Sequence, residues 1–537
     1  MADIASPAIA DQSADLESRD ISERNIDRLQ IGALGLPAIM LLSLASAAPL
    51  VGALGNVPLG IGLGNGQGMA AGFIWVTAVL LLFSVGYAAM ADKLTAAGGF
   101  YSFISHGLSR PFGMAAGWSA LFGYLLVEVA LIGALGYFTA NTMSSLFHID
   151  LSWVVYGFIG IAICTALTWG DVKISAKFLG VALVVETLSL LIMDFAILFK
   201  GGPSGVPLSP INPINAFKGI APGVGLFFAF WSFLGFEVVP NYAEESKNPR
   251  KHTRWGLYGA VTIIGVMYVL TVWAAVVGHG VGQVNKAATS DPVNFFYSLA
   301  GSYVGTWLVD IMKIFVCTSA LACALAFHQT TCRYFYALGR EDILHPKLGR
   351  THPKWGSPHV AVLLQGVLVS AAVGAFIGFW YLSKPAQTFS GNFANAPYFE
   401  LFGWMAIATT FFVLVNQVLS SLATIVFFRK PQHREDGRLW ATMLAPALGG
   451  VGMAVAIYLL ASNLATVGGD IIFVKLIPWV CVAWFLAGLG LAFWFRANRP
   501  KRYADLGRLV NRSLVIGEGE PVEAVTAAPS PDALSKH

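Results

Sequence analysis

The chain has little charge: of its 537 residues, 12% are Asp, Glu, Lys or Arg, whereas 56% are hydrophobic. Soluble domains carry about 25% charged residues, so this composition excludes an ordinary water-soluble protein. Cysteine is also scarce. The five cysteines lie in apolar segments and lack the spacing of a metal site, which argues against a disulfide framework and a zinc site. The long apolar segments that remain indicate a polytopic membrane protein.

Motifs of energy-driven or catalytic proteins are also missing. The sequence has no Gly-rich phosphate-binding loop, no hydrolytic triad and no cluster of metal ligands, which disfavours an ATP-driven pump and an enzyme. No cofactor or metal is predicted. Residues 1–30 lack the apolar core and cleavage site of a signal peptide. We predict cytoplasmic tails at 1–30 and 501–537, the second largely disordered, around a transmembrane domain at 31–500.

Apolar segments of about 20 residues are long enough to cross a membrane as helices, and the sequence contains about twelve of them. We call them spans 1 to 12. In chain order they are 32–54, 69–91, 112–142, 152–170, 176–199, 217–243, 255–278, 304–335, 358–381, 399–428, 439–461 and 472–496. The predicted fold is therefore an all-α polytopic membrane protein with about twelve transmembrane helices.

Lys and Arg residues gather in alternate loops, which predicts the orientation because basic loops remain on the cytoplasmic side. One set of loops holds clusters such as those at 247–254 and 340–354, whereas the opposite loops hold isolated lysines such as Lys286. This alternation predicts an even number of spans, both termini in the cytoplasm and a location in the cytoplasmic, or cell inner, membrane.

Two spans contain interruptions. In span 1, small residues at 46–48 run into Pro49, which lacks an N–H and disrupts an interior helix. In span 6, a small-residue break at 232–235 precedes Glu237, a carboxylate at mid-depth. A broken membrane helix is tolerated only where it lines a cavity or binds a ligand, and a buried charge indicates function. Interruptions at matching positions of two halves predict an inverted-repeat transporter site.

Three motifs then match one family. They are Ala96 to Tyr101 leading to Gly117-Trp118, the span 6 segment with its polar exit at 244–249, and Arg333 to Asp342 followed by His345-Pro346. Because these three motifs occur in this order, the chain resembles the amino acid–polyamine–organocation (APC) permeases over nearly its whole length. The resemblance implies a leucine-transporter-type (LeuT) fold, in which spans 1–5 and 6–10 form a 5+5 inverted repeat and spans 11–12 are two extra C-terminal helices.

The spacing from Trp231 to Glu237 is also similar to that of the arginine/agmatine antiporter branch. This resemblance implies that Trp231 covers the bound substrate and that Glu237 takes part in proton-linked gating. Aligned through the span 8 exit motif, His328 approaches a substrate-contacting position of the same branch. The chain departs from the family at 46–49, where a Gly-containing break is common, and at Glu186, where many proton-coupled relatives carry a lysine.

The unwound turns would expose helix N-termini, whose N–H groups suit a substrate carboxylate, and free carbonyls, which suit an ammonium group. Trp231 would offer a cation–π face to an amine, although an aromatic side chain in the core or against lipid is the alternative. The predicted substrate-binding residues are Ser46, Ala47, Ala48, Pro49, Tyr124, Trp231, Ser232, Phe233, Gly235 and His328.

Three acidic residues are predicted to couple proton movement to transport. Glu237, Glu186 and Glu128, in that order of preference, fall near the middle of their spans, where burial makes protonation at neutral pH accessible. Glu128 lies four residues after Tyr124 on one face of span 3, so it could instead counter a substrate amine. Each carboxyl could also be structural, hydrogen-bonded between helices. The cluster at 244–251 is predicted to be a helix stop and part of a cytoplasmic gate.

These features together predict an amino acid permease, a secondary active transporter that works by proton symport with alternating access. Sodium is the less favoured coupling ion, with possible oxygen ligands from Thr318 and Ser319. Other functions remain open: an amine or polyamine carrier, an amine–amino acid exchanger with Glu128 or Glu186 facing the cationic group, or a non-transporting nutrient receptor. The sequence leaves open the substrate, the direction of transport, the oligomeric state and partner subunits.

Overall fold

The computed structural model describes residue 29 and residues 32–94, 98–170, 172–383, 390–433 and 438–506. This part of the chain folds into helices and connecting loops, and within it the only β-structure is two isolated bridges. The predicted tails lie outside the described residues, except for Leu29 and for 501–506, which include most of the short helix α19, Pro500–Asp505. The all-α prediction is confirmed.

Within the described residues, ten helices are long and apolar enough to cross a membrane. One of them, Leu36–Lys93, contains both spans 1 and 2, and span 4 is the shorter apolar helix α7. Every predicted span is therefore helical. Spans 1 to 6 are α2 Leu36–Ala47 with α3 Pro49–Gly60, α4 Met69–Lys93, α6 Arg110–Phe147, α7 Trp153–Trp169, α8 Val172–Lys200, and α9 Pro222–Phe233 with the 3-10 helix η5 Phe236–Glu245. Spans 7 to 12 are α10 Pro249–His279, α13 Thr306–Arg340, α14 His359–Ser383, the π-helix η7 Pro397–Phe402 with α15 Gly403–Arg429, η9 Trp440–Leu444 with α16 Ala445–Ser462, and α18 Ile472–Asn498.

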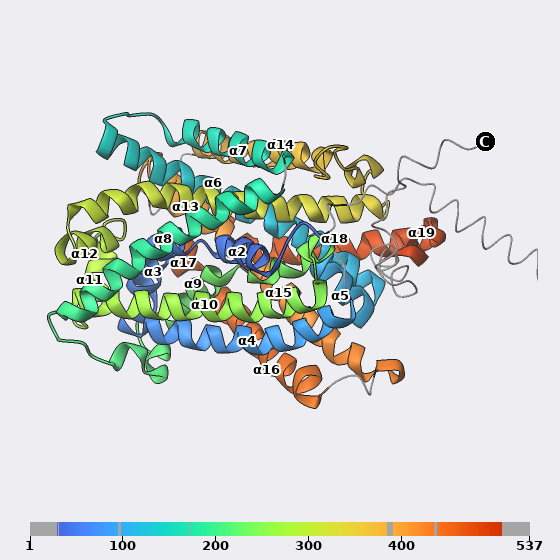
Figure 1. Cartoon of the computed structure of the whole chain (residues 1–537), viewed down its shortest axis with the longest axis horizontal. Helices are drawn as coiled ribbons and strands as arrows, with labels where there is room; N and C mark the ends of the chain where they lie inside the picture. The colour runs from blue at the N-terminus through green and yellow to red at the C-terminus, as the bar shows by residue number, and fades with distance from the viewer. Residues whose placement is uncertain are drawn as a thin grey trace, which may run out of the picture.

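The long helices run roughly along the longest axis of the molecule (Figure 1). Short helices mark its two ends: α5, Gly99–Gly107, lies with α19 at one end, and α11, Val284–Ser290, lies with α12, Phe295–Tyr303, at the other (Figure 1). We call the first the basic end, because the loops with the Lys and Arg clusters are there, and the second the opposite end.

Four pairs of helices that are five spans apart contact each other. Span 1 packs against span 6, span 2 against span 7, span 3 against span 8 and span 4 against span 9. Two inverted repeats folded against each other would produce this pairing. Spans 1 and 6 lie in the interior, where α2 and α3 also contact α10 and α13.

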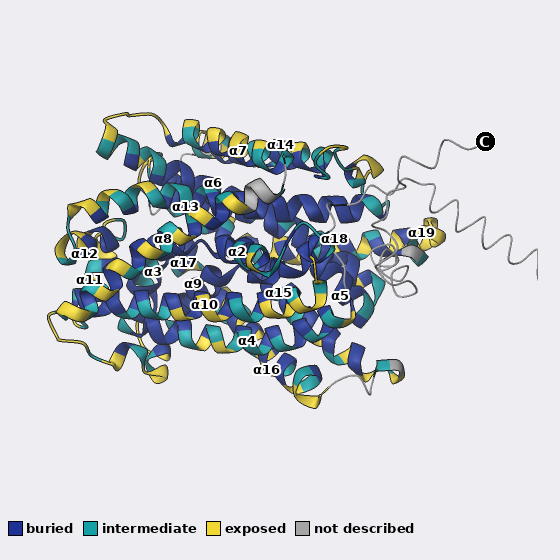
Figure 2. Cartoon of the chain, in the orientation of Figure 1, coloured by how far each residue is buried: buried dark blue, intermediate teal, exposed yellow. Residues whose placement is uncertain are grey.

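Burial separates the interior spans from the lipid-facing ones (Figure 2). In span 6, 94% of the most apolar stretch of 18 residues is buried, compared with 22% of the corresponding stretch in span 12. Large apolar side chains such as Leu188, Val367 and Trp479 are exposed on the outer helices. Such a surface suits hydrocarbon, whereas the polar groups freed by a broken helix must be satisfied inside the protein.

Candidate functional site

Span 1 is interrupted at Ala48. Helix α2 ends at Ala47 and α3 begins at Pro49, while Ala48 between them has φ 40° and ψ 73°, in the left-handed region. Pro49 suits the first position of a helix because its missing N–H would have no intrahelical partner there. The interruption therefore lies within the predicted segment 46–49. The freed carbonyl of Ala47 accepts a hydrogen bond of 3.1 Å from the Tyr268 hydroxyl.

Span 6 is interrupted at Leu234 and Gly235, a narrower segment than the predicted 232–235. Ser232 and Phe233 form the last turn of α9, and the Ser232 hydroxyl donates to the Phe228 carbonyl at 2.8 Å. Gly235 has φ 108°, a conformation that favours glycine. A side chain at this position would collide with Cβ of Ser46, so glycine also lets the two breaks approach each other.

Glu237 holds the span 6 break to span 3. Its Oε2 accepts a hydrogen bond of 3.0 Å from the Gly235 N–H, and its Oε1 accepts one of 3.0 Å from the Tyr124 hydroxyl. The side chain is buried, with 1% of its surface exposed. The structure thus brings the two predicted residues Tyr124 and Glu237 together, and the carboxyl connects the shape of the break to a neighbouring helix.

The two breaks border a cavity of about 20 Å³, enough for about one water molecule. Of the predicted substrate-binding residues, Ser46, Ala47, Ala48, Trp231 and Ser232 line it. The other residues that line it are Val51, Gly52, Asn56, Val127, Leu131, Leu234, Cys323, Phe327 and Phe402. Because the space is much smaller than an amino acid, the surrounding side chains must move before a substrate of that size can bind.

Asn56 is a polar lining residue that the sequence analysis missed. Its Nδ2 donates to the Ser232 Oγ at 2.9 Å, and its Oδ1 is buried without a hydrogen-bond partner. A buried amide oxygen without a partner costs free energy, so this atom is poised to accept a hydrogen bond from a ligand. The available signal was an asparagine two residues beyond the predicted end of span 1.

The other predicted substrate-binding residues do not line the cavity. Phe233 points to the far side of span 6, where its ring lies 6.2 Å from that of Phe73 and 6.3 Å from that of Tyr268. Tyr124 lies outside the cavity, where its hydroxyl donates to Glu237 and its ring stacks on that of Phe327, with 5.9 Å between the centroids. Pro49 and Gly235 shape the breaks rather than the cavity surface, and His328 belongs to a separate cluster.

That cluster joins spans 3, 8 and 9. His328 Nδ1 lies 2.7 Å from Oε1 of Glu128, and Gln365 donates to Oε2 of the same carboxyl at 2.7 Å. All three side chains are fully buried, and none of them lines the cavity between the breaks. The sequence analysis singled out Glu128 and His328 for separate roles, but the structure brings them together as partners.

Glu186 lies behind span 1. Its carboxyl is near the Ser319 hydroxyl and the Leu50 N–H, but neither of its oxygens has a partner in hydrogen-bonding geometry. The Ser319 Oγ instead accepts a hydrogen bond of 3.2 Å from the Val51 N–H. A fully buried carboxyl therefore lies beside the first turn of α3, although Glu186 is not among the residues that line the cavity.

A larger cavity of about 360 Å³ lies toward the opposite end. It is lined by residues from α3, α9, α11 and span 10, and we call it the vestibule. Phe402, in the π-helical turn of span 10, lines both the vestibule and the central cavity. Its ring meets Trp231 edge-on, with 5.7 Å between centroids. Phe402 therefore forms part of the wall between the cavities, and Trp231 packs against it on the side of the central cavity. Phe402 had no distinguishing signal among 37 phenylalanines.

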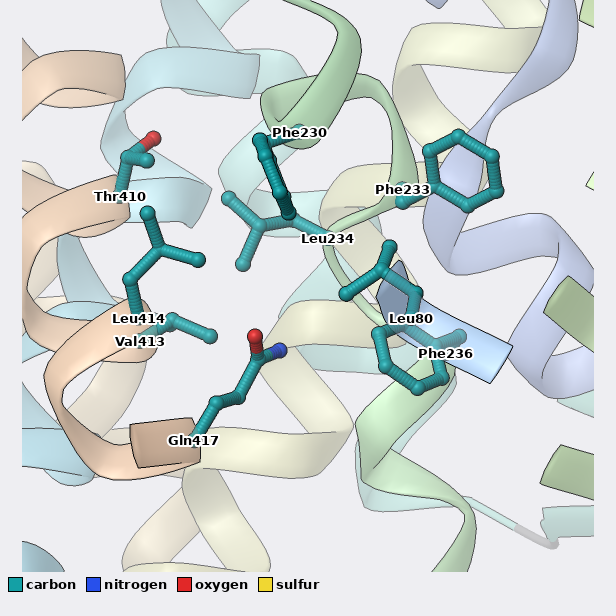
Figure 3. Close-up of a pocket in the computed structure, with 9 residues that line it drawn as sticks. All are labelled: Leu80, Phe230, Phe233, Leu234, Phe236, Thr410, Val413, Leu414 and Gln417. Atoms are coloured by element: carbon teal, nitrogen blue, oxygen red, sulfur yellow. The ribbon is translucent and has the colours of Figure 1, made fainter. Parts of the chain in front are cut away.

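A third space of about 10 Å³ lies on the other face of the span 6 break, between span 10 and α4 (Figure 3). Leu234 lines both this space and the central cavity, so one residue of the break forms the wall between them. Gln417 of α15 points into the space (Figure 3), and its Oε1 is buried without a partner.

Ion pairs join spans 6 and 8 at the basic end of the molecule. Arg333 Nε donates to Glu245 at 2.7 Å, and the Arg333 guanidinium lies over the Tyr242 ring at 4.3 Å. Arg340 donates to Glu244 at 3.2 Å. The predicted gate cluster thus joins spans 6 and 8. Leu34, just before α2, makes backbone hydrogen bonds of 2.9 Å with Glu245 and with Lys247. These bonds connect the start of span 1 to the same cluster.

Replacing Arg333 with methionine is expected to destabilise the protein by about 3–5 kcal/mol, because the buried Glu245 carboxylate loses its partner. Thermal unfolding of the purified protein in detergent would measure the loss as a lower Tm. Adding Glu245→Gln to Arg333→Met should recover most of the Tm, since no unpaired charge then remains. An unchanged Tm in the single variant would contradict the role of this pair.

Broken interior helices that meet at a buried cavity, with ion pairs between spans 6 and 8 at one end and a vestibule toward the other, define a multi-pass membrane transporter. The model of the family described as "Amino acid permease" matches residues 34–490, most of the chain. The protein belongs to the amino acid permease family, and its resemblance to the APC permeases is confirmed.

Relatives within this family differ in what they carry. The chain is 24% identical to the branched-chain amino acid permease BcaP of Bacillus subtilis (strain 168) over 335 residues, 59% of this chain and 70% of BcaP. It is 26% identical to the methylthioribose transporter of the same organism over 49% of this chain and 54% of that protein. The low-affinity putrescine importer PlaP of Escherichia coli (strain K12) is 23% identical over 55% of this chain and 64% of PlaP. The chain thus spans less than two thirds of the last two relatives.

Proposed function

We propose that this protein moves an amino acid across the cytoplasmic membrane by proton symport, with alternating access to a site at the two breaks. The observation that carries the proposal is that the interruptions at Ala48 and at 234–235 lie in buried helices and border one cavity. Unwound backbone is tolerated at such a position only where its polar groups meet a ligand or a polar cavity.

The helix ends at the cavity suit a zwitterion. The first turn of α3 lines the cavity with Val51 and Gly52, and the last turn of α9 lines it with Trp231 and Ser232. A helix N-terminus carries partial positive charge and a C-terminus partial negative charge. The substrate carboxylate would therefore bind near the start of α3 and its ammonium group near the ends of α9 and α2.

Trp231 and Phe402 would form the lid of the site. Phe402 lines both the central cavity and the vestibule and Trp231 packs against it, so a joint movement of the two rings would connect the two spaces. In the proposed cycle, substrate enters from the vestibule while the ion pairs of Arg333 and Arg340 keep the basic end closed. Breaking those pairs would open the other side.

Glu237 would be the principal proton carrier. Two donors, the Gly235 N–H and the Tyr124 hydroxyl, hold both oxygens of its carboxyl. A carboxylate can accept at both oxygens, but a protonated carboxyl must use one oxygen as a donor. Protonation would therefore disturb one of these two hydrogen bonds, and with it the geometry of the break beside Trp231.

Glu186 would be a second proton carrier, because its buried carboxyl faces the Leu50 N–H at the start of α3 without a well-formed hydrogen bond. Glu128 differs because His328 and Gln365 engage both of its oxygens. We assign Glu128 and His328 the structural alternative, a polar cluster that holds spans 3, 8 and 9 together. Tyr124 would act through Glu237 rather than on the substrate.

The contacts between helices five spans apart support the LeuT-type inverted repeat. The basic loops support a cytoplasmic location for the basic end, with both termini on that side. Uptake would then run from the vestibule to the basic end. Sodium remains the less favoured coupling ion.

Flux into proteoliposomes tests this function. With an acidic outside solution and neutral inside solution, labelled amino acid should accumulate, and a protonophore should abolish the accumulation. Uptake into vesicles without internal amino acid separates symport from exchange. A sodium gradient should not replace the proton gradient. Binding without flux would contradict the proposal and favour the receptor alternative.

A further inference from the structure

The cavity between the breaks has a polar side and an apolar side. Its polar side-chain groups come from spans 1 and 6: the hydroxyls of Ser46 and Ser232 and the amide of Asn56. The walls contributed by spans 3, 8 and 10 are formed by apolar, aromatic or thiol side chains. They are Val127, Leu131, Cys323, Phe327 and Phe402.

Val127 and Leu131 are four residues apart on α6, so they share one face of that helix. The groups that suit a zwitterion belong to the broken helices, whereas these two residues come from an unbroken one. A substrate held by its carboxylate and ammonium groups at the breaks would direct its side chain away from them, toward α6.

No carboxylate is among the described residues that line this cavity. Three buried glutamates lie around it, but none of them lines it. Glu237 is bonded to the break itself and to span 3. Glu128 pairs with His328 and Gln365. Glu186 lies beside Ser319 and the Leu50 N–H.

A second ammonium or a guanidinium group would therefore enter the cavity without a counter-ion. Moving a charge out of water is costly unless a partner and hydrogen bonds compensate. The faces of Trp231 and Phe327 could attract a cation, but this attraction is weaker than the lost hydration. An aliphatic side chain instead gains free energy when the same walls remove it from water.

We propose that the substrate is a neutral amino acid with an aliphatic side chain, and that Val127 and Leu131 contact this side chain. The proposal rests on the proposed transport function and narrows its substrate class. The family relatives do not make this choice, since their names include both a branched-chain amino acid permease and a putrescine importer.

Competition in proteoliposomes tests the substrate class. Unlabelled leucine, isoleucine, valine, lysine, agmatine and putrescine would each compete with labelled leucine for uptake by the wild-type protein. The aliphatic amino acids are expected to inhibit at concentrations about a hundredfold lower than lysine and the two amines. Equal inhibition by lysine or putrescine would overturn the proposal while leaving amino acid transport intact.

Leu131→Ala tests the contact. Removing part of this wall should shift the ratio of phenylalanine uptake to valine uptake upward by about tenfold, because a larger side chain then fits. Leu126→Ala is the matched control, since Leu126 is on the same helix but does not line the cavity. An unchanged ratio in a folded Leu131→Ala protein would overturn the assigned contact.

Failure of the proposed function would look different. In that case no amino acid or amine would accumulate, although the reconstituted protein still unfolds cooperatively on heating and is therefore folded. A transported amine with no transported amino acid would also reject both the substrate class and the amino acid permease function. Transport of a polar or basic amino acid would reject only the substrate class.

Discussion

Replacing Glu237 with glutamine is expected to abolish the pH dependence of uptake and to lower its rate at least about tenfold, the scale of one lost charge-assisted hydrogen bond. The carboxyl accepts from the Gly235 N–H and from the Tyr124 hydroxyl. Glutamine offers only one oxygen, so one of these donors would face an NH₂ group, and the side chain could no longer exchange a proton.

The measurement is initial uptake of leucine into proteoliposomes across a series of outside pH values. Glu400→Gln provides a matched control. Glu400 is also fully buried, but it accepts from the Ser390 N–H at 3.0 Å and lines neither the central cavity nor the vestibule. Wild-type pH dependence in Glu237→Gln would remove Glu237 from the coupling mechanism.

Replacing Gly235 with alanine should eliminate uptake and lower the Tm of the protein. At φ 108° an L-residue is strained by about 1–3 kcal/mol. The added Cβ would also collide with Cβ of Ser46 and lie 3.1 Å from Cζ of Phe327. Relief of the collision would separate the two breaks, and the cavity between them would lose its shape.

Gly378→Ala is the control for Gly235→Ala. Gly378 lies within α14, and a Cβ added there meets no atom within 4 Å. Alanine at an open position of a helix interior should leave both uptake and Tm close to wild type. If Gly235→Ala instead transported at the wild-type rate, the close approach of the two breaks would be unnecessary for function.

The positions of the membrane helices and of their interruptions could be predicted from the sequence, because both depend on local chemistry. A run of apolar residues favours a helix in hydrocarbon wherever it occurs in the chain. Pro49 interrupts span 1 through its own missing N–H, and Gly235 permits a backbone conformation that other residues avoid. The functional importance of Glu237 could also be predicted locally, because a charge in an apolar span is costly whatever its neighbours are.

Tertiary structure decided which side chains meet. Glu128 and Gln365 are 237 positions apart, yet they share a hydrogen bond, and this contact together with His328 removes Glu128 from the cavity. Phe402 lies opposite Trp231 only because span 10 packs against the span 6 break. Periodicity and composition carry no information on such pairings, since many helix packings bury the same apolar faces. The sequence by itself thus determined the spans and the places where two of them break. The packing of spans 3, 8 and 10 around those breaks determined the chemistry of the cavity.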